Sequence, residues 1–354
     1  MPDARVEAAI ANWAPRFVSQ GVDFNDLRRT TARIERWDEW LDAWTVSASE
    51  HRALADEAEV AGDRLTAGEA FVRAALSYHF AKFVWTVDLK RHREATEHAI
   101  ECVYAAHRHL DPKAERIEIP FEDTKLVGNL RRPGSEARPP LVLLIPGLDS
   151  TKEEFFNWEN VFLQRGLATL SLDGPGQGES GFATHIRPEY EQAVAAALDV
   201  LAGRRDLDLD RVGAVGVSLG GYYAPRAAAG EPRIRAVVGV SGPFNFGECW
   251  DGLPPLTRET FRHHSGAGDD EAAREKALEL DLGPVIGELR QPALMVTGKL
   301  DRIIPWEQTR RIAAEAPHAR FVLYEEGTHV CNNVPYKYRP LVADWIRKEV
   351  EHVG

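Results

Sequence analysis

The stretch Arg211-Val-Gly-Ala-Val-Gly-Val-Ser-Leu-Gly-Gly221 decides the fold that we expect for this chain. Its first half is apolar and β-branched, which predicts a strand over 212–217 that runs directly into Gly-x-Ser-x-Gly. In a nucleophile elbow, this pattern places the serine on a sharp turn between a strand and a helix. Glycines two positions either side of Ser218 are expected there, because a Cβ would collide with neighbouring backbone. A chance Gly-rich pentapeptide is the alternative, and the strand before the motif argues against it.

Apolar runs typical of strands recur along most of the chain after Asp111-Pro112. The eight runs are 116–119, 125–130, 141–145, 168–172, 212–217, 236–240, 293–296 and 321–324. Helical patterns, for example over 190–203 and 306–316, separate most of them. This alternation predicts an α/β fold with one eight-stranded, mostly parallel sheet covered by helices on both faces. Ligands bind such sheets at the carboxyl ends of the strands.

Residues 1–112 are expected to form an all-helical domain, ahead of a catalytic sheet domain over 113–354. Trp37, Trp40, Leu41 and Trp44 fall at i, i+3, i+4 and i+7, which places three tryptophans on one helix face. Packing in a core is the favoured interpretation of this face, and substrate contact is the alternative. Because an apolar helix face must be buried against something, we expect a homodimer with this domain at the interface or roofing the active site.

Composition excludes several kinds of partner. The net charge of −12 and the pI of about 5.5 argue against binding to nucleic acid or to anionic membranes. The three cysteines show no C-x-x-C spacing, which indicates reduced thiols and a cytoplasmic location. Residues 1–21 lack the apolar core of a signal peptide, and no run reaches the ~20 apolar residues of a membrane span.

No metal or cofactor is expected from the sequence. His263-His264 lies among charged residues, as a solvated surface pair would, and no H-E-x-x-H motif is present. The Gly-rich turn 173–178 follows a strand but lacks the Lys-Ser/Thr of a phosphate-binding loop. We therefore interpret this turn as a tight loop beside the active site.

Three side chains that follow predicted strands carry the expected chemistry. Ser218 needs a base, because a serine hydroxyl is a poor nucleophile until its proton is removed. His329, after strand 321–324, would be that base, and Asp301, after strand 293–296, would orient it. The chain order Ser, Asp, His is the order found in α/β-hydrolases.

Two backbone N–H groups are expected to form an oxyanion hole for this serine. Leu148 follows strand 141–145 in the turn Pro146-Gly-Leu-Asp-Ser150, and Leu219 opens the helix after Ser218. Donors fixed at these two positions would hold the negative oxygen of a tetrahedral intermediate.

From about residue 116 onward, the chain resembles the α/β-hydrolase superfamily. Taken whole, it resembles the group that contains 2,6-dihydroxypseudooxynicotine hydrolase, with FrsA-like esterases and fungal polyketide-shortening hydrolases as relatives. The motifs that carry this closer resemblance are Pro146-Gly-Leu-Asp-Ser-Thr-Lys-Glu-Glu154, Asp173-Gly-Pro-Gly-Gln-Gly178, Ser218-Leu-Gly-Gly-Tyr-Tyr223, Trp250-Asp-Gly-Leu-Pro-Pro-Leu-Thr257 and Phe261-Arg-His-His-Ser-Gly266. The resemblance implies a dimer whose Ser-His-Asp triad hydrolyses a carbon–carbon bond beside a ketone, or a simpler ester.

Residues from about 244 to 284 are expected to form a lid insert. Glu248 lies near its start, between the aromatic residues Phe246 and Trp250, and a carboxyl among aromatic rings should have a raised pKa. The resemblance implies that an acidic residue at this place acts on the substrate, and a surface glutamate is the alternative. Tyr222, Glu248 and Trp250 are therefore our candidates for substrate contact.

The expected reaction is attack of Ser218 on a ketone or acyl carbon of a small molecule. Carbon–carbon cleavage releases a carbanion, so β-diketones and acylated aromatic or heteroaromatic rings fit better than plain ketones. A carboxylesterase or an acyltransferase with the same triad is the alternative enzyme. A non-catalytic binding protein on the same fold is less favoured, because all three triad residues are present.

Overall fold

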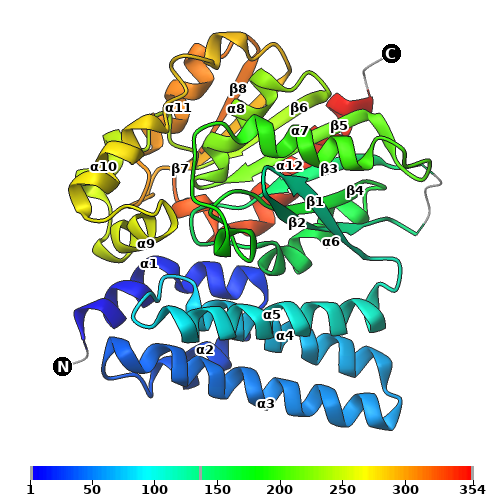
Figure 1. Cartoon of the computed structure of the whole chain (residues 1–354), viewed down its shortest axis with the longest axis vertical. Coiled ribbons are helices and arrows are strands. Elements are labelled where there is room, and N and C mark those ends of the chain that lie inside the picture. The colour runs from blue at the N-terminus through cyan, green and yellow to red at the C-terminus, as the bar shows by residue number, and fades with distance from the viewer. Residues whose placement is uncertain (1–2, 135–137, 352–354) are drawn as a thin grey trace. The chain divides into compact units, whose positions relative to one another are not determined.

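The computed structural model describes residues 3–134 and 138–351, which divide into two compact units (Figure 1). The helical unit comprises Met1–Ala114 and Glu153–Asn157, and the sheet unit comprises Glu115–Lys152 and Trp158–Gly354. The sequence pattern did not indicate that 153–157 joins the helices. Residues 1–2, 135–137 and 352–354 belong to the expected domains and lie outside the described residues.

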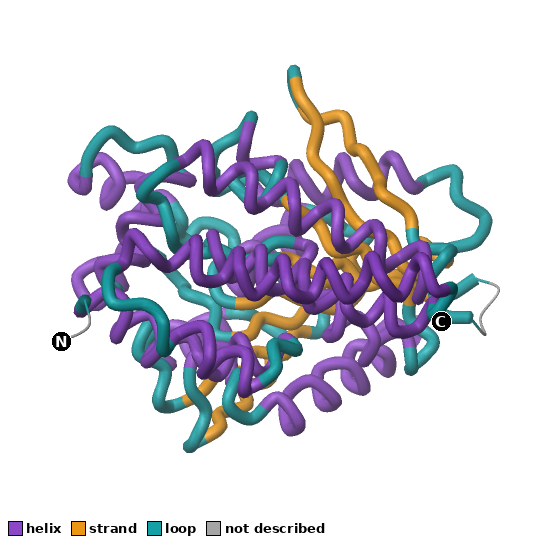
Figure 2. Tube along the Cα trace, turned by 90° about the horizontal axis from the view of Figure 1, so that it is seen from below, coloured by secondary structure: helices purple, strands orange, loops and turns teal. Residues whose placement is uncertain are grey.

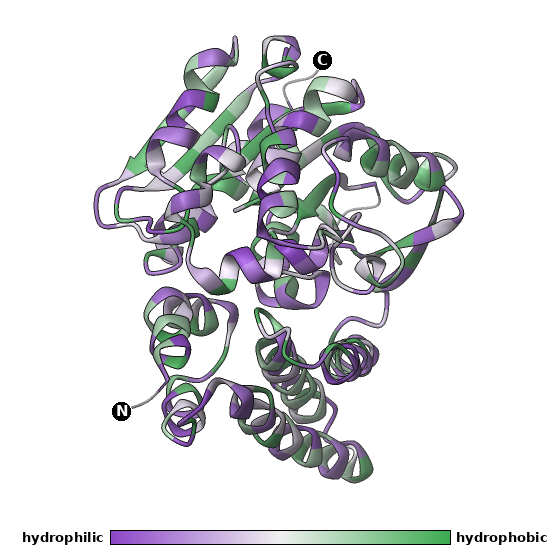
Figure 3. Ribbon diagram, turned by 60° about the vertical axis from the view of Figure 1, so that its left-hand side comes forward, coloured by the Kyte–Doolittle hydropathy of each residue, from purple (hydrophilic) through white to green (hydrophobic). Residues whose placement is uncertain are grey.

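Five α-helices and one 3₁₀ turn make up the described part of residues 1–114. They are α1 (Ala4–Gln20), α2 (Phe24–Thr31), η1 (Trp37–Glu39), α3 (Trp40–Ala61), α4 (Arg64–Lys82) and α5 (Leu89–Leu110). Helix α5 begins at Leu89, because the Asp88 side chain accepts the N–H groups of Lys90 and Arg91 as an N-cap. Hydrophobic and hydrophilic residues alternate along these helices (Figure 3).

The tryptophan face of α3 packs inside the helical unit. Trp40 and Trp44 are fully buried, and the Phe17 ring contacts both of them. Trp40 Nε1 also donates a hydrogen bond to Phe80 O at 2.9 Å, which satisfies the polar edge of the indole. Core packing is therefore the role of this face. The idea that it remains exposed for a second subunit is wrong, because α1 and α4 already cover it.

Glu154 ties segment 153–157 to the helices of this unit. Its carboxylate is 1% exposed and accepts two hydrogen bonds from Arg16, at 2.7 and 2.6 Å, and one from Gln20 at 3.0 Å. His79 Nε2 lies 3.1 Å from the same carboxylate. Burial raises the pKa of Glu154, but the charge and hydrogen bonds of Arg16 outweigh it and hold that pKa well below its usual range. Removing either partner would leave a buried charge uncompensated, which is strongly destabilising.

The described residues of the sheet unit form one eight-stranded sheet, as expected. In sheet order the strands are β1 (Glu115–Phe121), β2 (Thr124–Arg131), β4 (Ala168–Asp173), β3 (Pro140–Ile145), β5 (Asp208–Val217), β6 (Ile234–Val240), β7 (Ala293–Gly298) and β8 (Ala319–Tyr324). Strand β2 runs antiparallel to both β1 and β4, and every pairing from β4 across to β8 is parallel. The carboxyl ends of β3 to β8 therefore lie at one edge of the sheet. Figure 2 shows the strands of this sheet in orange.

Helices cover both faces of this sheet because alternate residues of each strand point to opposite sides. A Cβ at Gly213 of β5 would meet Ile346, whereas a Cβ at Gly216 would meet Ala224. The covering helices are α7 (Tyr190–Leu201), α8 (Gly220–Gly230), α11 (Trp306–Glu315) and α12 (Pro335–Glu351). Close packing of this kind explains why β3, β4 and β7 are buried along their whole length.

The expected lid insert is a helical excursion that is closed at its base. It contains η4 (Gly247–Gly252), α9 (Pro255–His264) and α10 (Asp270–Glu279). Phe246 N donates to Leu280 O, and Leu282 N donates to Phe244 O, both at 3.0 Å. These bonds join the start and end of the insert, so it projects from the sheet unit at a fixed root. Among the described residues, no helix combines the length and hydrophobicity needed to cross a membrane.

We expect Trp40→Ala to lower the free energy of unfolding by about 3–5 kcal/mol, because it opens a cavity among packed aromatic rings. The matched control is Val60→Ala, also on α3, whose side chain is 91% exposed and should change that free energy by less than about 0.5 kcal/mol. Urea unfolding followed by circular dichroism measures both. Equal, small effects of the two substitutions would contradict the core assignment.

Candidate active site

The turn at Ser218 is enforced by close backbone packing. Ser218 has φ of 56°, a left-handed conformation that non-glycine residues rarely adopt. A Cβ at Gly216 would lie 1.8 Å from Gly220 O, and a Cβ at Gly220 would lie 2.2 Å from Ile145 O. Only glycine fits at either position, so the Gly-x-Ser-x-Gly pattern is a steric requirement of this turn.

Ser218, His329 and Asp301 meet at the carboxyl edge of the sheet. His329 Nε2 lies 2.9 Å from Ser218 Oγ, and His329 Nδ1 lies 2.8 Å from Asp301 Oδ2. The Asp301 side chain is fully buried, and its Oδ1 accepts the N–H groups of Ile303 and Ile304, both at 2.9 Å. Three side chains far apart in sequence thus form one hydrogen-bonded set, the arrangement expected of a nucleophile, a base and an orienting carboxylate.

The loop that carries His329 is strained and is held by a residue that the sequence did not reveal. Val330 and Cys331 have φ of 56° and 53°, in the left-handed region. This conformation is costly for non-glycine residues, and most of all for the β-branched Val330. The Val330 N–H donates to Ser241 Oγ at 3.0 Å, and Ser241 follows strand β6. Burial raises the pKa of the Cys331 thiol to about 12, so this neighbour of His329 stays protonated at neutral pH.

The two expected oxyanion donors flank Ser218. Leu219 is the N-cap residue of α8, where backbone N–H groups lack partners within the helix. Leu148 follows Gly147, whose Cβ, if present, would lie 3.0 Å from Ser218 Cβ and 3.4 Å from Ser218 Oγ. The turn after β3 therefore passes directly against the serine, as the expected oxyanion hole requires.

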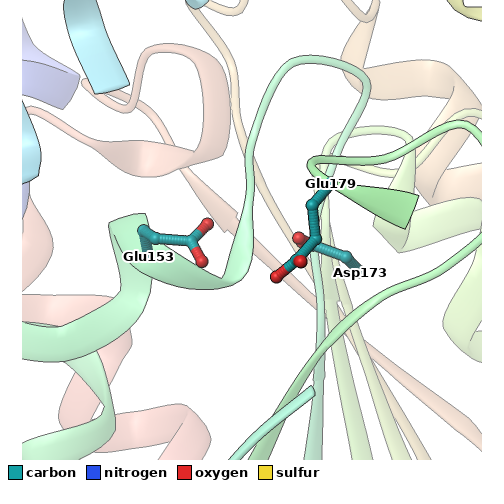
Figure 4. Close-up of side chains that lie close together, drawn as sticks. All are labelled: Glu153, Asp173 and Glu179. Carbon is teal, nitrogen blue, oxygen red and sulfur yellow. The ribbon is translucent and has the colours of Figure 1, made fainter. Parts of the chain in front are cut away.

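Buried charges hold the loop that follows β4. Lys152 and Asp173 are fully buried, and Lys152 Nζ lies 3.0 Å from Asp173 and 2.6 Å from Glu179. Figure 4 shows the carboxyl groups of Asp173 and Glu179 close together. Burial raises the pKa of Glu179, but hydrogen bonds from Arg116 and the charge of Lys152 outweigh it and lower that pKa to about 2. The loop is thus a tight structural turn, and its charges are paired.

Comparison with known proteins places this geometry in a family. The family model of FrsA-like esterases matches residues 22–245, and that of the prolyl oligopeptidase family matches residues 154–350. A curated relative, 2,6-dihydropseudooxynicotine hydrolase of Paenarthrobacter nicotinovorans, is 32% identical over 342 residues, which cover 96% of this chain and 92% of the relative. The chain belongs to the FrsA-like esterase family of α/β-hydrolases. It is therefore a hydrolytic enzyme.

Solved and curated relatives agree with this assignment. The crystal structure titled 2,6-dihydroxy-pseudo-oxynicotine hydrolase superposes with a TM-score of 0.87 at 32% identity and covers 96% of both chains. A 20-hydroxy-prefusarin hydrolase of Gibberella moniliformis is 36% identical over 246 residues, which span 65% of this chain and 58% of that protein. The expected α/β-hydrolase fold with an N-terminal helical region is confirmed.

Glu248 does not lie among aromatic rings, although the residues next to it in the sequence suggested that it would. Its side chain is 46% exposed; Gln308 Nε2 donates to its carboxylate at 2.8 Å, and Arg311 lies 3.3 Å from it. The expectation of a carboxyl enclosed by aromatic rings is wrong, because η4 turns the rings of Phe246 and Trp250 inward and Glu248 outward.

The two other candidates for substrate contact are buried. Trp250 is 4% exposed and packs edge-on against Phe261, with ring centroids 5.8 Å apart. Tyr222 is fully buried in the first turn of α8, and its hydroxyl lies 3.5 Å from Pro188 O. His263 and His264 are also half-buried rather than solvated, and their rings meet edge-on. Both aromatic candidates belong to packed cores, and their contact with substrate stays a prediction.

We expect Glu248→Gln to change kcat/KM by less than about twofold, because exposed ion pairs contribute little and screening by solvent is strong. Parallel assays with benzoylacetone, an aryl β-diketone, and with p-nitrophenyl acetate measure this. A 10²-fold loss on the diketone alone, the size expected of a general acid–base group, would restore the catalytic role that the sequence suggested.

Proposed function

We propose that this enzyme is a serine hydrolase that cleaves a carbon–carbon bond next to a ketone. The observation that carries the proposal is the continuous hydrogen-bonded chain from Ser218 through His329 to Asp301, with distances of 2.9 and 2.8 Å. The N–H groups of Leu148 and Leu219 are proposed as the oxyanion hole. No cofactor or metal takes part in the proposed reaction.

The reaction begins when Ser218 Oγ attacks a carbonyl carbon of the substrate and its proton passes to His329. The carbonyl oxygen becomes an anion held by the two backbone donors, and Asp301 stabilises the imidazolium. The adjacent carbon–carbon bond then breaks, and the departing carbanion takes the proton from His329. Water, deprotonated by His329, releases the acyl group as a carboxylic acid and restores the serine.

The carbon–carbon bond is favoured by the relative that spans nearly the whole chain. That relative is named as a hydrolase of an oxynicotine derivative, and the likeness includes both the helical and the sheet unit. Its name gives a pseudooxynicotine compound as the substrate of that relative. Because a carbanion leaves only when its charge is delocalised, we propose β-diketones or acylated aromatic and heteroaromatic rings as the substrate class.

Hydrolysis of carboxylic esters is the second candidate function. Both family models that match the chain describe enzymes of acyl transfer to water, an esterase and a peptidase family. An alkoxide leaving group needs only the triad and the oxyanion hole, and an acyltransferase would use the same acyl-enzyme. Product analysis separates the two bonds, since benzoylacetone gives a carboxylic acid and a ketone only if its carbon–carbon bond is cleaved.

We expect Ser218→Ala, His329→Ala and Asp301→Asn each to lower kcat by roughly 10³-fold or more, because the three residues act as one unit. The free energy of unfolding should change by less than about 2 kcal/mol. The measurements are turnover of benzoylacetone and p-nitrophenyl acetate, and covalent labelling by a fluorophosphonate. Labelling of the wild type with no labelling of Ser218→Ala supports the nucleophile.

A Ser218→Ala protein with full turnover would overturn the mechanism. Wild-type protein that resists the fluorophosphonate would favour a binding protein without hydrolytic activity. Activity on the ester with no cleavage of any β-diketone would favour the esterase.

We also propose that the enzyme is a cytoplasmic homodimer. Its three cysteines, Cys102, Cys249 and Cys331, are free and buried, as expected in a reducing compartment. Because the tryptophans of α3 are inside the helical unit, another surface of residues 1–112 would form the interface. Multi-angle light scattering at micromolar concentration should give about twice the 39.5 kDa of one chain. A single-chain mass would contradict the dimer.

A further inference from the structure

Gln177 connects the loop after β4 to the turn that carries the proposed oxyanion donor. Its side-chain Nε2 donates to Pro146 O at 2.7 Å and to Gly147 O at 3.0 Å. Its Oε1 accepts the N–H of Gly174 at 2.9 Å and the hydroxyl of Tyr190 at 2.9 Å. The residue is 1% exposed, so solvent does not compete for these bonds.

These partners fix the orientation of the amide. Two backbone carbonyl oxygens can only accept, and the Gly174 N–H can only donate, so Nε2 must face the turn at 146–147. The amide of Gln177 uses both of its N–H donors and both acceptor positions of its oxygen. If the amide were flipped, its oxygen would face the carbonyl oxygens of Pro146 and Gly147, and both contacts would be repulsive. The amide can therefore adopt only one of its two orientations.

The geometry of the peptide bond carries this orientation to the oxyanion hole. In a trans peptide, the C=O of one residue and the N–H of the next point in opposite directions. The described residues contain no cis peptide. When Gln177 holds Gly147 O, it therefore aims the N–H of Leu148 away from itself. Gly147 lies next to Ser218: a Cβ at Gly147 would be 3.0 Å from the Cβ of Ser218.

We infer that Gln177 is a positioning residue that sets the direction of the Leu148 N–H toward the oxyanion. This inference rests on the proposed serine-hydrolase function and adds a residue to it. Gln177 touches no reacting atom and acts through the peptide between Gly147 and Leu148. Without it, the two carbonyls at 146 and 147 would lack these donors, and the turn could rotate the N–H away from the bound oxygen.

The surroundings of Gln177 show why it can serve as a rigid support. Tyr190 is fully buried and stacks on Tyr223 of α8, with ring centroids 4.3 Å apart. A Cβ at Gly174 would lie 2.4 Å from the Tyr190 ring, so glycine at that position allows this close approach. Helix α8, which begins just after Ser218, thus connects through two tyrosines to the residue that holds the other side of the oxyanion hole.

The test uses Gln177→Met, which keeps the length of the side chain and removes all four hydrogen bonds. We expect kcat/KM for p-nitrophenyl acetate to fall by roughly 10- to 100-fold, somewhat less than the 10²–10³-fold loss of a whole oxyanion donor. Most of the loss should be in kcat, with KM changed less than about threefold, because ground-state binding does not use the oxyanion.

Trifluoroacetophenone supplies a readout that a merely structural role would not move. Ser218 adds to its ketone carbon, the serine proton passes to His329, and the former carbonyl oxygen becomes an anion in the oxyanion hole. Its inhibition constant should rise by the same factor as kcat/KM falls. The matched control is Gln291→Met, whose Nε2 donates to Ala228 O at 2.7 Å and which should leave both quantities unchanged.

Tyr190→Phe gives a second, milder variant if Gln177→Met folds poorly. It removes one hydrogen bond to Gln177 Oε1 and keeps the ring, so we expect a smaller loss, roughly 3- to 10-fold, with a matching rise in the inhibition constant. Unchanged inhibition by trifluoroacetophenone in either folded variant overturns the inference. If the wild type takes up a fluorophosphonate at Ser218 while the Gln177 variant keeps full turnover, only this inference fails. If the wild type is not labelled at all, the proposed function fails first.

Discussion

The site depends on one steric constraint, the close approach of backbone around Ser218. The serine adopts a left-handed φ of 56° in a very tight turn. A Cβ at Gly216 or at Gly220 would collide with a neighbouring carbonyl oxygen, so only glycine permits this turn. This turn lifts the hydroxyl out of the sheet edge and places the start of α8 beside it. The His329 loop and the Gly147 turn both reach that point. The His329 loop does so with a strained backbone at Val330 and Cys331, and the Gly147 turn does so because glycine allows close contact with Ser218.

Buried hydrogen bonds turn the loops around this point into rigid supports. Asp301 receives two backbone N–H groups, the loop of His329 is held by Ser241, and the turn at Gly147 is held by Gln177. Each of these groups is largely shielded from water. In such a place, leaving a polar atom without a hydrogen-bond partner destabilises the fold by more than a satisfied hydrogen bond stabilises it. The geometry of the proposed active site is therefore held by hydrogen bonds from groups outside the expected triad.

The outcome for Glu248 shows the limit of reasoning from neighbours in the sequence. Aromatic residues on both sides of it suggested an enclosed carboxyl, but successive side chains of a short 3₁₀ helix point in different directions. Phe246 and Trp250 turn into the insert, and Glu248 faces Gln308 and solvent. Similarly, the tryptophan face of α3 is covered by α1 and α4, which no pattern within α3 itself could show.

Local rules were enough to predict the eight strands and the elbow, because strand period, β-branched runs and glycines at 216 and 220 act over a few residues. The chain order of Ser218, Asp301 and His329 by itself indicates a triad, because the carboxyl ends of parallel strands share one edge of a sheet. Only the tertiary structure decided which polar groups are buried and with what partners, as for Gln177 with two carbonyl oxygens. It alone showed that Glu154 pairs with Arg16, across 138 residues of sequence. Such partnerships join residues far apart in the chain, and their strength comes from the exclusion of water, which no local pattern records.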